Sequence, residues 1–212
     1  MTEFPTLLLD GFDRFKKERF SRDHSLYRSL AEHGQTPAVM VIACCDSRTA
    51  PETIFQTAPG ELFVVRNVAN LVPPHEPDGA YHGTSAALEF AVQSLRVRHI
   101  VVLGHGGCGG IRAALRPSGA PLSPDDFIGK WMSQLRPIMG RLRSSDRSSE
   151  EELQTVLERA SVRNSITNLR SFPYIANLED RGELSLHGAW FDIAEGELWT
   201  MNPSTGEFAT AK

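Results

Sequence analysis

Three short runs of consecutive apolar residues stand out in the first half of the chain. They cover residues 38–43, 62–65 and 100–103, and none alternates apolar with polar positions. Continuous apolar runs of this length are typical of strands buried on both faces of a parallel sheet. Residues 84–95, between the second and third runs, begin with a hydroxyl side chain and contain good helix formers, so we expect a crossover helix there. This alternation predicts an α/β fold.

The two ends of the chain follow other patterns. From residue 7 to residue 32 apolar side chains recur near helical spacing, which predicts two amphipathic helices. These helices either cover the core or form an arm that packs on a neighbouring subunit. We expect a helix over residues 150–170 and a terminal hairpin from residues 184–193 and 198–201. Residues 117–147, rich in Pro, Ser and Arg, are expected to form helix and surface loop.

These elements predict one domain over residues 1–212, with a helical arm over residues 1–34. The expected fold is α/β, with a mainly parallel β-sheet, a C-terminal antiparallel strand and flanking helices. The length of 212 residues with 41% hydrophobic composition suits a single core. No run approaches the ~20 apolar residues of a membrane-spanning helix. An acid stands near the N-terminus where a secretory signal has Lys or Arg, which favours a cytoplasmic protein.

Charge and cysteine content narrow the function. The net charge of -4 argues against a broad basic face, so we expect a small-molecule substrate and neither nucleic acid nor membrane as partner. Of the three cysteines, two are adjacent and the third follows 63 positions later, which is poor material for disulfides. Metal binding or thiol chemistry is the better interpretation.

Two clusters of reactive side chains follow predicted strands. Cys44 comes directly after the first run, with Asp46 and Arg48 close behind, and a glycine-rich loop after the third run carries His105 and Cys108. Ligand sites in open α/β sheets lie beyond the carboxyl ends of the strands. Thiolate and imidazole favour zinc, and three protein ligands leave a fourth tetrahedral position for water or substrate.

Each cluster also has a simpler interpretation. The glycines allow two ligands three residues apart to converge on one ion, but a glycine-rich loop can instead cradle phosphate. Cys108 alone is typical of a small buried residue, and Asp46 with Arg48 of an ordinary ion pair at a strand end. The coincidence of both clusters with strand ends favours the metal site.

Along most of its length the chain resembles the β-carbonic anhydrase family. The resemblance rests on Cys-x-Asp-x-Arg at residues 44–48, on His-x-x-Cys at residues 105–108 and on FQTAPGELFVVRNVANL at residues 55–71. Residues 186–192, LHGAWFD, are similar to the last large strand of the family. The implied activity is the reversible hydration of carbon dioxide to bicarbonate and a proton.

The resemblance also implies the roles of the clustered residues. One Zn²⁺ per chain is held by Cys44, His105 and Cys108, and zinc-bound hydroxide is the nucleophile. Asp46, held by Arg48, orients this nucleophile by accepting a hydrogen bond from it. The chemistry agrees, because zinc lowers the pKa of bound water and an adjacent guanidinium favours the ionised carboxylate.

The substrate pocket is assigned by the same resemblance. Phe63, Val68 and Phe90 are implied to form an apolar wall, partly contributed by a second subunit, and Gln35 and the Gly109 amide to contact substrate. Without the family, core packing and a loop position explain these residues as well. The shared pocket and the arm imply a homodimer or a dimer-based tetramer.

Family members differ in whether the aspartate leaves zinc open to water or binds it at lower pH. Gln35, nine residues before Cys44, matches the open, plant-like members, and Val41 stands where the closed members have tryptophan. We therefore predict an open, water-bound zinc near neutral pH. Phe90 departs from the tyrosine common in plant-like members, and Gln93 replaces a histidine that some members are thought to use for proton transfer.

Two other functions fit the same residues. One is a carbonyl sulfide or carbon disulfide hydrolase on the same scaffold, and the other is a non-catalytic zinc-binding regulatory protein. The presence of Asp46 and Arg48 argues against the second. Cys45 stands where the family has a small or polar residue; a passive side chain is the preferred interpretation, and an oxidation-prone site is the alternative.

Overall fold

A six-stranded sheet forms the centre of the computed structural model, which describes residues 4–77, 82–115, 121–142 and 149–211. Its strands are β1 (Val39–Cys44), β2 (Leu62–Asn67), β3 (His99–His105), β4 (Ser185–Asp192), β5 (Glu197–Met201) and β6 (Phe208–Thr210). The order across the sheet is β2-β1-β3-β4-β5-β6. The first four of these pair in parallel, and β5 and β6 pair antiparallel. This arrangement confirms the predicted fold class.

The three predicted strands are all present, and each extends past the C-terminal end of its apolar run. Strand β2 lies at the edge of the sheet and is only partly buried, so the expectation of burial on both faces is wrong for it. Strand β1 ends at Cys44 and strand β3 ends at His105. The two strands are parallel neighbours in register from Val39 opposite His99. Both candidate ligands therefore lie at the same edge of the sheet, as the sequence predicts.

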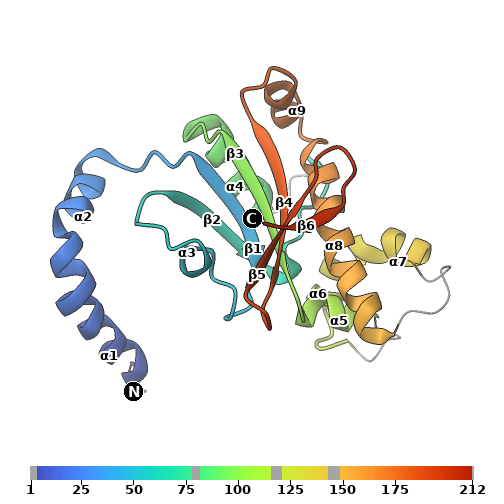
Figure 1. Ribbon diagram of the computed structural model, residues 1–212, viewed down its shortest axis with the longest axis horizontal. Helices are drawn as coiled ribbons and strands as arrows, with labels where there is room; N and C mark the ends of the chain where they lie inside the picture. Colours follow the sequence, from blue (N-terminus) through green and yellow to red (C-terminus); the bar gives the residue numbers. More distant parts are fainter. Residues whose placement is uncertain (1–3, 78–81, 116–120, 143–148, 212) are drawn as a thin grey trace.

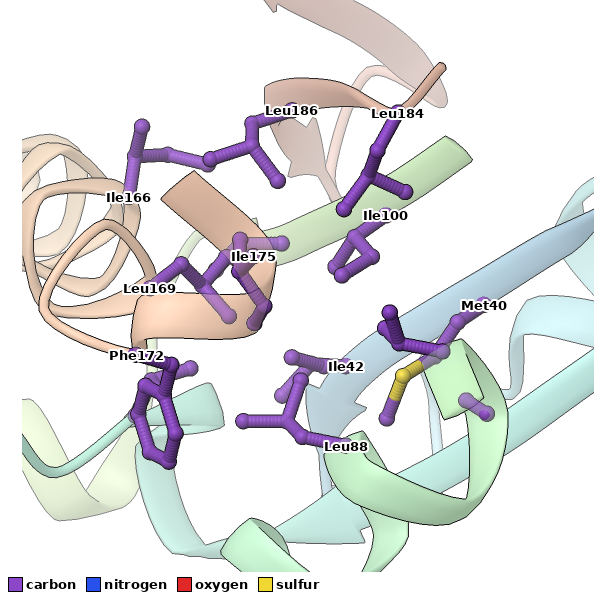
Figure 2. Close-up of a cluster of buried hydrophobic side chains, with 14 of the residues drawn as sticks. Met40, Ile42, Leu88, Ile100, Ile166, Leu169, Phe172, Ile175, Leu184 and Leu186 are labelled. Carbon is purple, nitrogen blue, oxygen red and sulfur yellow. The ribbon is translucent and has the colours of Figure 1, made fainter. Parts of the chain in front are cut away.

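The helices cover the sheet unevenly (Figure 1). They are α1 (Thr6–Phe15), α2 (Ser21–His33), α3 (Pro51–Ile54), α4 (Gly83–Glu89), α5 (Gly109–Leu115), α6 (Phe127–Met132), α7 (Arg136–Leu142), α8 (Glu150–Leu169) and α9 (Pro173–Asp180). One sheet face packs against α4, α8 and α9 through the main hydrophobic cluster (Figure 2). There Ile42 and Ile100 of the sheet meet Leu88, Leu169 and Ile175 of the helices, all fully or almost fully buried. This core fixes α8 against the strands that carry the ligands.

Helix α8 confirms the prediction for residues 150–170 and begins with a capping box. The Ser149 hydroxyl accepts from the Glu152 N–H at 3.2 Å, and the Glu152 carboxylate accepts from the Ser149 N–H at 2.9 Å. Its buried side is partly polar at helical spacing, with residues Gln154, Glu158, Ser161 and Ser165. Polar groups in this position need partners within the protein, and two of them find those partners at the candidate site.

The N-terminal helices form an arm that stands apart from the sheet (Figure 1). Helices α1 and α2 are joined by the π-helical turn η1 (Lys16–Phe20), and none of these three elements contains a buried residue. Leu7 is 77% exposed and Phe12 is 56% exposed. Of the two roles considered, core cover within the same chain is therefore wrong for the described residues, where Leu30 of α2 lies beside Gly60 but most of the apolar side of the arm stays exposed.

Three details differ from the sequence prediction or extend it. The helix expected over residues 84–95 is α4 followed by the π-helical turn η3 (Phe90–Ser94). Strand β6 was not predicted, because a run of three residues carries no periodic signal. In the region of residues 117–147 the structure has α6, the 3₁₀ turn η4 (Ser133–Leu135) and α7, while residues 116–120 and 143–148 lie outside the described residues.

No helix within the described part of the chain is both long and apolar enough to cross a membrane.

Candidate metal centre

Three ligand-type side chains meet at the carboxyl edge of the sheet. Cys44 ends β1, His105 ends β3, and Cys108 lies in the loop just before α5. All three residues are buried, and their ligand atoms lie within 4.8 Å of one another. The two sulfur atoms are 4.0 Å apart. Two thiolates bound to one tetrahedral zinc lie about 3.8 Å apart, so the observed sulfur pair fits that ion.

The loop between His105 and Cys108 can follow its path only with glycine at particular positions. A Cβ on Gly106 would lie 3.1 Å from the Trp190 ring. Gly107 has a φ of 66°, in the left-handed region that other residues rarely adopt. The glycines therefore turn the chain tightly enough to bring His105 and Cys108 to one point, as the sequence predicts.

Of the two ring nitrogens of His105, one has a hydrogen-bond partner and the other has none among the described residues. Its Nδ1 lies 2.9 Å from the carbonyl oxygen of Gly106, an arrangement that suits donation to this oxygen. Its Nε2 is buried and has no hydrogen-bond partner among the described residues. Metal-bound histidines commonly donate their second ring N–H to a carbonyl in this way. The orphaned Nε2 is thus the nitrogen expected to bind a metal.

The shared surroundings of the two buried thiols change their pKa values in opposite directions. The contact with the Cys108 sulfur, followed by the proximity of the His105 ring, lowers the pKa of Cys44 to about 4. The same sulfur contact, together with burial, raises the pKa of Cys108. Burial opposes protonation of His105, but the nearby Cys44 sulfur and the hydrogen bond to the Gly106 carbonyl outweigh this and raise its pKa. A thiolate is therefore already favoured at this edge of the sheet, and a divalent cation would favour the second one as well.

Asp46 is held beside the cluster by Arg48. The guanidinium donates from Nε to Oδ1 at 2.9 Å and from Nη2 to Oδ2 at 2.7 Å, and the Arg48 main-chain N–H donates to Oδ1 at 3.0 Å. These bonds hold the pKa of Asp46 well below its usual range. Oδ2 lies 4.0 Å from the orphaned Nε2 of His105. The carboxylate is ionised, oriented and adjacent to the place where a metal would sit.

Two further groups that the sequence analysis did not single out support Cys44. The Arg66 side chain donates to the carbonyl oxygens of Cys44 and Asp46 at 2.8 and 2.6 Å. The Ala69 N–H donates to the Cys44 sulfur at 3.4 Å. Ala69 and Asn70 have φ values of 65° and 48°, in the left-handed region, which asparagine adopts more readily than alanine. Ordinary residue types hide this backbone conformation, so no sequence signal pointed to it.

Helix α8 supplies the other pair missed from the sequence. Glu158 is 2% exposed and accepts a hydrogen bond from the Cys108 N–H at 2.9 Å. Gln154 donates to Glu158 at 2.8 Å and accepts from Arg112 at 3.0 Å. A weak signal existed, because Gln154 and Glu158 share helical spacing with the apolar residues of α8.

The predicted substrate residues do not form one group in the single chain, and only Val68 packs against the cluster that contains Cys44 and Cys108. Phe63 and Phe90 pack together with ring centroids 5.8 Å apart, and Phe90 is 49% exposed. Val68 lines a groove of about 730 Å³ with Trp131 and other residues, and none of the three metal-ligand candidates lines that groove. Gly109 begins α5 beside Cys108. Gln35 is exposed and precedes β1, at the opposite end of that strand from Cys44.

Cys45 differs from its neighbour in exposure. It is exposed, whereas Cys44 is 5% exposed. Successive side chains of an extended segment point to opposite sides, so Cys45 faces away from the cluster.

Comparison of the sequence with known proteins agrees with the family resemblance seen in its motifs. A family model described as carbonic anhydrase matches residues 39–198. The chain is 36% identical over 200 residues to beta carbonic anhydrase 3 of Arabidopsis thaliana, covering 92% of this chain and 76% of the plant protein.

Solved structures agree with the sequence comparison. The structure of the β-carbonic anhydrase CcaA matches with a TM-score of 0.87 at 30% identity, over 98% of this chain and 92% of that chain. A structure from a study of tetrameric β-carbonic anhydrases of Sordaria macrospora matches with a TM-score of 0.79 at 27% identity, over 98% of both chains. The fold and the buried cysteine and histidine cluster thus define an enzyme of the carbonic anhydrase type. The chain belongs to this family, within its β class.

Proposed function

We propose that the chain binds one Zn²⁺ through Cys44, His105 and Cys108 and catalyses the reversible hydration of carbon dioxide. The observation that carries this proposal is the buried Nε2 of His105, which has no protein partner among the described residues and lies near two cysteine sulfurs and a fixed carboxylate. A buried donor or acceptor left without a partner is costly, and a metal ion would remove that cost.

Among the residues of the chain, Asp46 has the central role in the proposed reaction. When bound, zinc supplies a Lewis acid that lowers the pKa of water enough for that water to attack carbon dioxide at neutral pH. Asp46 accepts a hydrogen bond from the attacking water and thereby orients it. Arg48 keeps Asp46 ionised and prevents it from turning, through the two side-chain bonds described above.

The same contacts support an open site near neutral pH. Both oxygens of Asp46 are engaged by Arg48, so binding of this carboxylate to the metal would require breaking at least one charge-assisted hydrogen bond. Val41, at 1% exposure in β1, leaves no aromatic side chain at the position where closed family members carry one. A crystal structure near neutral pH with an Asp46 oxygen bonded to zinc would contradict the open site.

Substrate binding is proposed to involve two subunits. Phe63, Val68 and Phe90 form the apolar wall for carbon dioxide with part of it contributed by the second subunit, since Val68 does not lie with the Phe63–Phe90 pair in one chain. The Gly109 amide contacts the product. Gln35 lies at the far end of β1 from its own Cys44, so it is proposed to serve the site of a second subunit. The unpartnered arm and the tetrameric relative support assembly into a homodimer or a dimer-based tetramer.

The proposal is tested by metal analysis and stopped-flow hydration of carbon dioxide on the purified chain. We expect one zinc per chain and rapid hydration. Asp46→Ala should keep its zinc and lose about 10²- to 10⁴-fold in kcat/KM, the usual contribution of a group that orients and accepts a reacting proton. Asp180→Ala, which removes an exposed carboxylate on α9, should match the wild type.

Two results would redirect the proposal. A zinc-loaded wild type without hydration activity would favour the non-catalytic regulatory protein. Faster release of sulfide from carbonyl sulfide or carbon disulfide than hydration of carbon dioxide would favour the hydrolase on the same scaffold.

A further inference from the structure

The main chain of Cys108 is held on both sides by helix α8. Its N–H donates to Glu158 Oε1 at 2.9 Å, and its carbonyl oxygen accepts from Gln154 Nε2 at 3.3 Å. Gln154 and Glu158 are four residues apart, so they lie on one face of the helix, one turn from each other. Helix α8 is in turn fixed to β3 and β4 by the hydrophobic core. Cys108 is therefore tied to a rigid element 46 to 50 residues away in sequence.

Glu158 itself is a buried carboxylate surrounded by N–H donors. In addition to Cys108, Gln154 Nε2 donates to its Oε1 at 2.8 Å, and Trp190 Nε1 of β4 donates to its Oε2 at 3.1 Å. No ion pair among the described residues includes Glu158. Burial raises its pKa, and the three N–H contacts oppose this rise. A carboxylate is costly to keep here, and the fold keeps its orientation fixed at both oxygens.

The loop that carries Cys108 has little rigidity of its own. Residues 106 and 107 before the cysteine are glycine, and glycines 109 and 110 begin the short helix α5 after it, so no neighbouring side chain restricts the backbone on either side. A ligand on such a loop would lose much of its freedom only when the metal binds. Prior fixation of the loop removes that entropic cost from metal binding.

We propose that Glu158, assisted by Gln154, is a positioning residue that fixes the Cys108 main chain so that its sulfur stays directed at Cys44 and His105. This inference rests on the proposed metal site. It assigns Glu158 no contact with the metal or the substrate. The side chain acts through Cys108, and Trp190 holds the second carboxylate oxygen in place.

The test is the zinc affinity of the full-length chain, measured on the metal-free protein by competition with a chromophoric chelator. Glu158→Gln replaces one acceptor oxygen by an NH₂ group, which would face an N–H of Cys108 or Trp190. We expect zinc to bind about 10- to 100-fold more weakly, the usual effect of losing a group that holds a metal ligand. The matched control is Glu151→Gln, which removes an exposed carboxylate from the first turns of the same helix and should leave the affinity unchanged.

A spectroscopic readout separates positioning from general stability. In the Co²⁺-substituted protein the thiolate-to-metal charge-transfer band reports how the cysteine sulfurs contact the metal. Glu158→Gln should weaken or shift this band while the far-ultraviolet circular dichroism stays that of the wild type. If Glu158→Gln does not fold, Gln154→Ala decides, because it keeps the Glu158 carboxylate and removes the contact to the Cys108 carbonyl, the support of Glu158 and the contact with Arg112. It should still weaken zinc binding several-fold.

The outcomes distinguish the two proposals. A wild type that binds no zinc overturns the metal site and the positioning role together. A wild type that binds zinc, with a folded Glu158→Gln of equal affinity and unchanged cobalt band, overturns the positioning role alone. Where Glu158→Gln does not fold, a Gln154→Ala variant that binds zinc as tightly as the wild type likewise overturns the positioning role alone.

Discussion

Arg48 determines which way the Asp46 carboxylate points. One guanidinium occupies both carboxylate oxygens and also lies 3.4 Å from the Gly107 carbonyl, so it links the β1 end to the ligand loop. A side chain that is itself half exposed thus controls a partly buried one. The geometry of the nucleophile depends on this arginine as much as on the aspartate.

Arg48→Ala should therefore lower hydration activity without removing the metal. We expect kcat/KM to fall about 10- to 100-fold, as for other groups that orient an active-site side chain, because Asp46 becomes free to rotate. Stopped-flow hydration and metal analysis on the same sample check this. Arg181→Ala, which breaks an exposed ion pair with Glu183, serves as control. Unchanged activity in Arg48→Ala would show that Asp46 is held by other contacts.

A pH effect is expected away from the metal centre, where two histidines meet on neighbouring strands. His99 Nδ1 and His187 Nε2 are 3.2 Å apart. Desolvation and then the charge of His99 lower the pKa of His187 below its usual value of 6.5. The unfolded chain therefore binds more protons than the folded chain around and below pH 6.5, and folding stability is lost as the pH falls through this window.

His187→Gln should reduce this loss. We expect the difference in melting temperature between pH 7.5 and pH 5.5 to be smaller in the variant than in the wild type, measured by thermal unfolding at both values. His33→Gln, on the exposed arm, is a control that leaves the histidine pair intact. An equal pH dependence in His187→Gln and wild type would contradict the assignment.

At the scale of elements, strand β3 approaches helix α8 so closely at residue 104 that this position requires glycine. A Cβ on Gly104 would lie 2.8 Å from Cγ2 of Val162, and Val162 is fully buried. This contact sets the distance between the helix and the strand that carries His105.

Gly104→Ala should destabilise the fold by about 1–3 kcal/mol, the usual cost of overfilling a packed core. Chemical denaturation measures this change in the free energy of unfolding. In the double variant with Val162→Ala, part of the loss should be recovered relative to the sum of the single effects. Strict additivity of the two substitutions would show that the backbone relaxes at Gly104 without involving Val162.

The same elements explain which parts of the structure the sequence could predict. Strands β1, β2 and β3 were predictable because their continuous apolar runs have few alternatives, although only β1 and β3 are largely buried. The positions of Cys44 and His105 follow from the ends of β1 and β3. The contact of Glu158 with Cys108 could not be predicted, because it joins residues 50 positions apart and depends on how α8 lies on the sheet. The strained backbone at Ala69 was hidden for another reason, since alanine carries no signal for a positive φ.

At the scale of the molecule, the arm is the part that a single chain leaves incomplete. Sequence periodicity predicted its helices but could not decide what they cover, because amphipathic spacing is the same against a core or a second subunit. The structure excludes the core of the same chain, since no residue of α1 or α2 is buried.

Charged substitutions on the apolar side of the arm should therefore affect assembly more than folding. Leu8→Glu with Phe12→Glu should lower the mass measured by sedimentation velocity, because both side chains are more than half exposed in the single chain and would be buried only between subunits. Lys17→Glu places a carboxylate at an exposed polar position of the arm and should leave the mass unchanged. An unaltered mass in the double variant would exclude the arm as an assembly contact.

The pairing of β1 with β3 has a consequence for how the protein reaches its final form. Cys44 and His105 are adjacent only when Val39 stands opposite His99. A slip of β1 by one position would turn Cys44 to the other face and bring Cys45 towards the loop in a different geometry. The two ligand candidates therefore depend on strand alignment over the whole length of β1, and not only on the residues beside them.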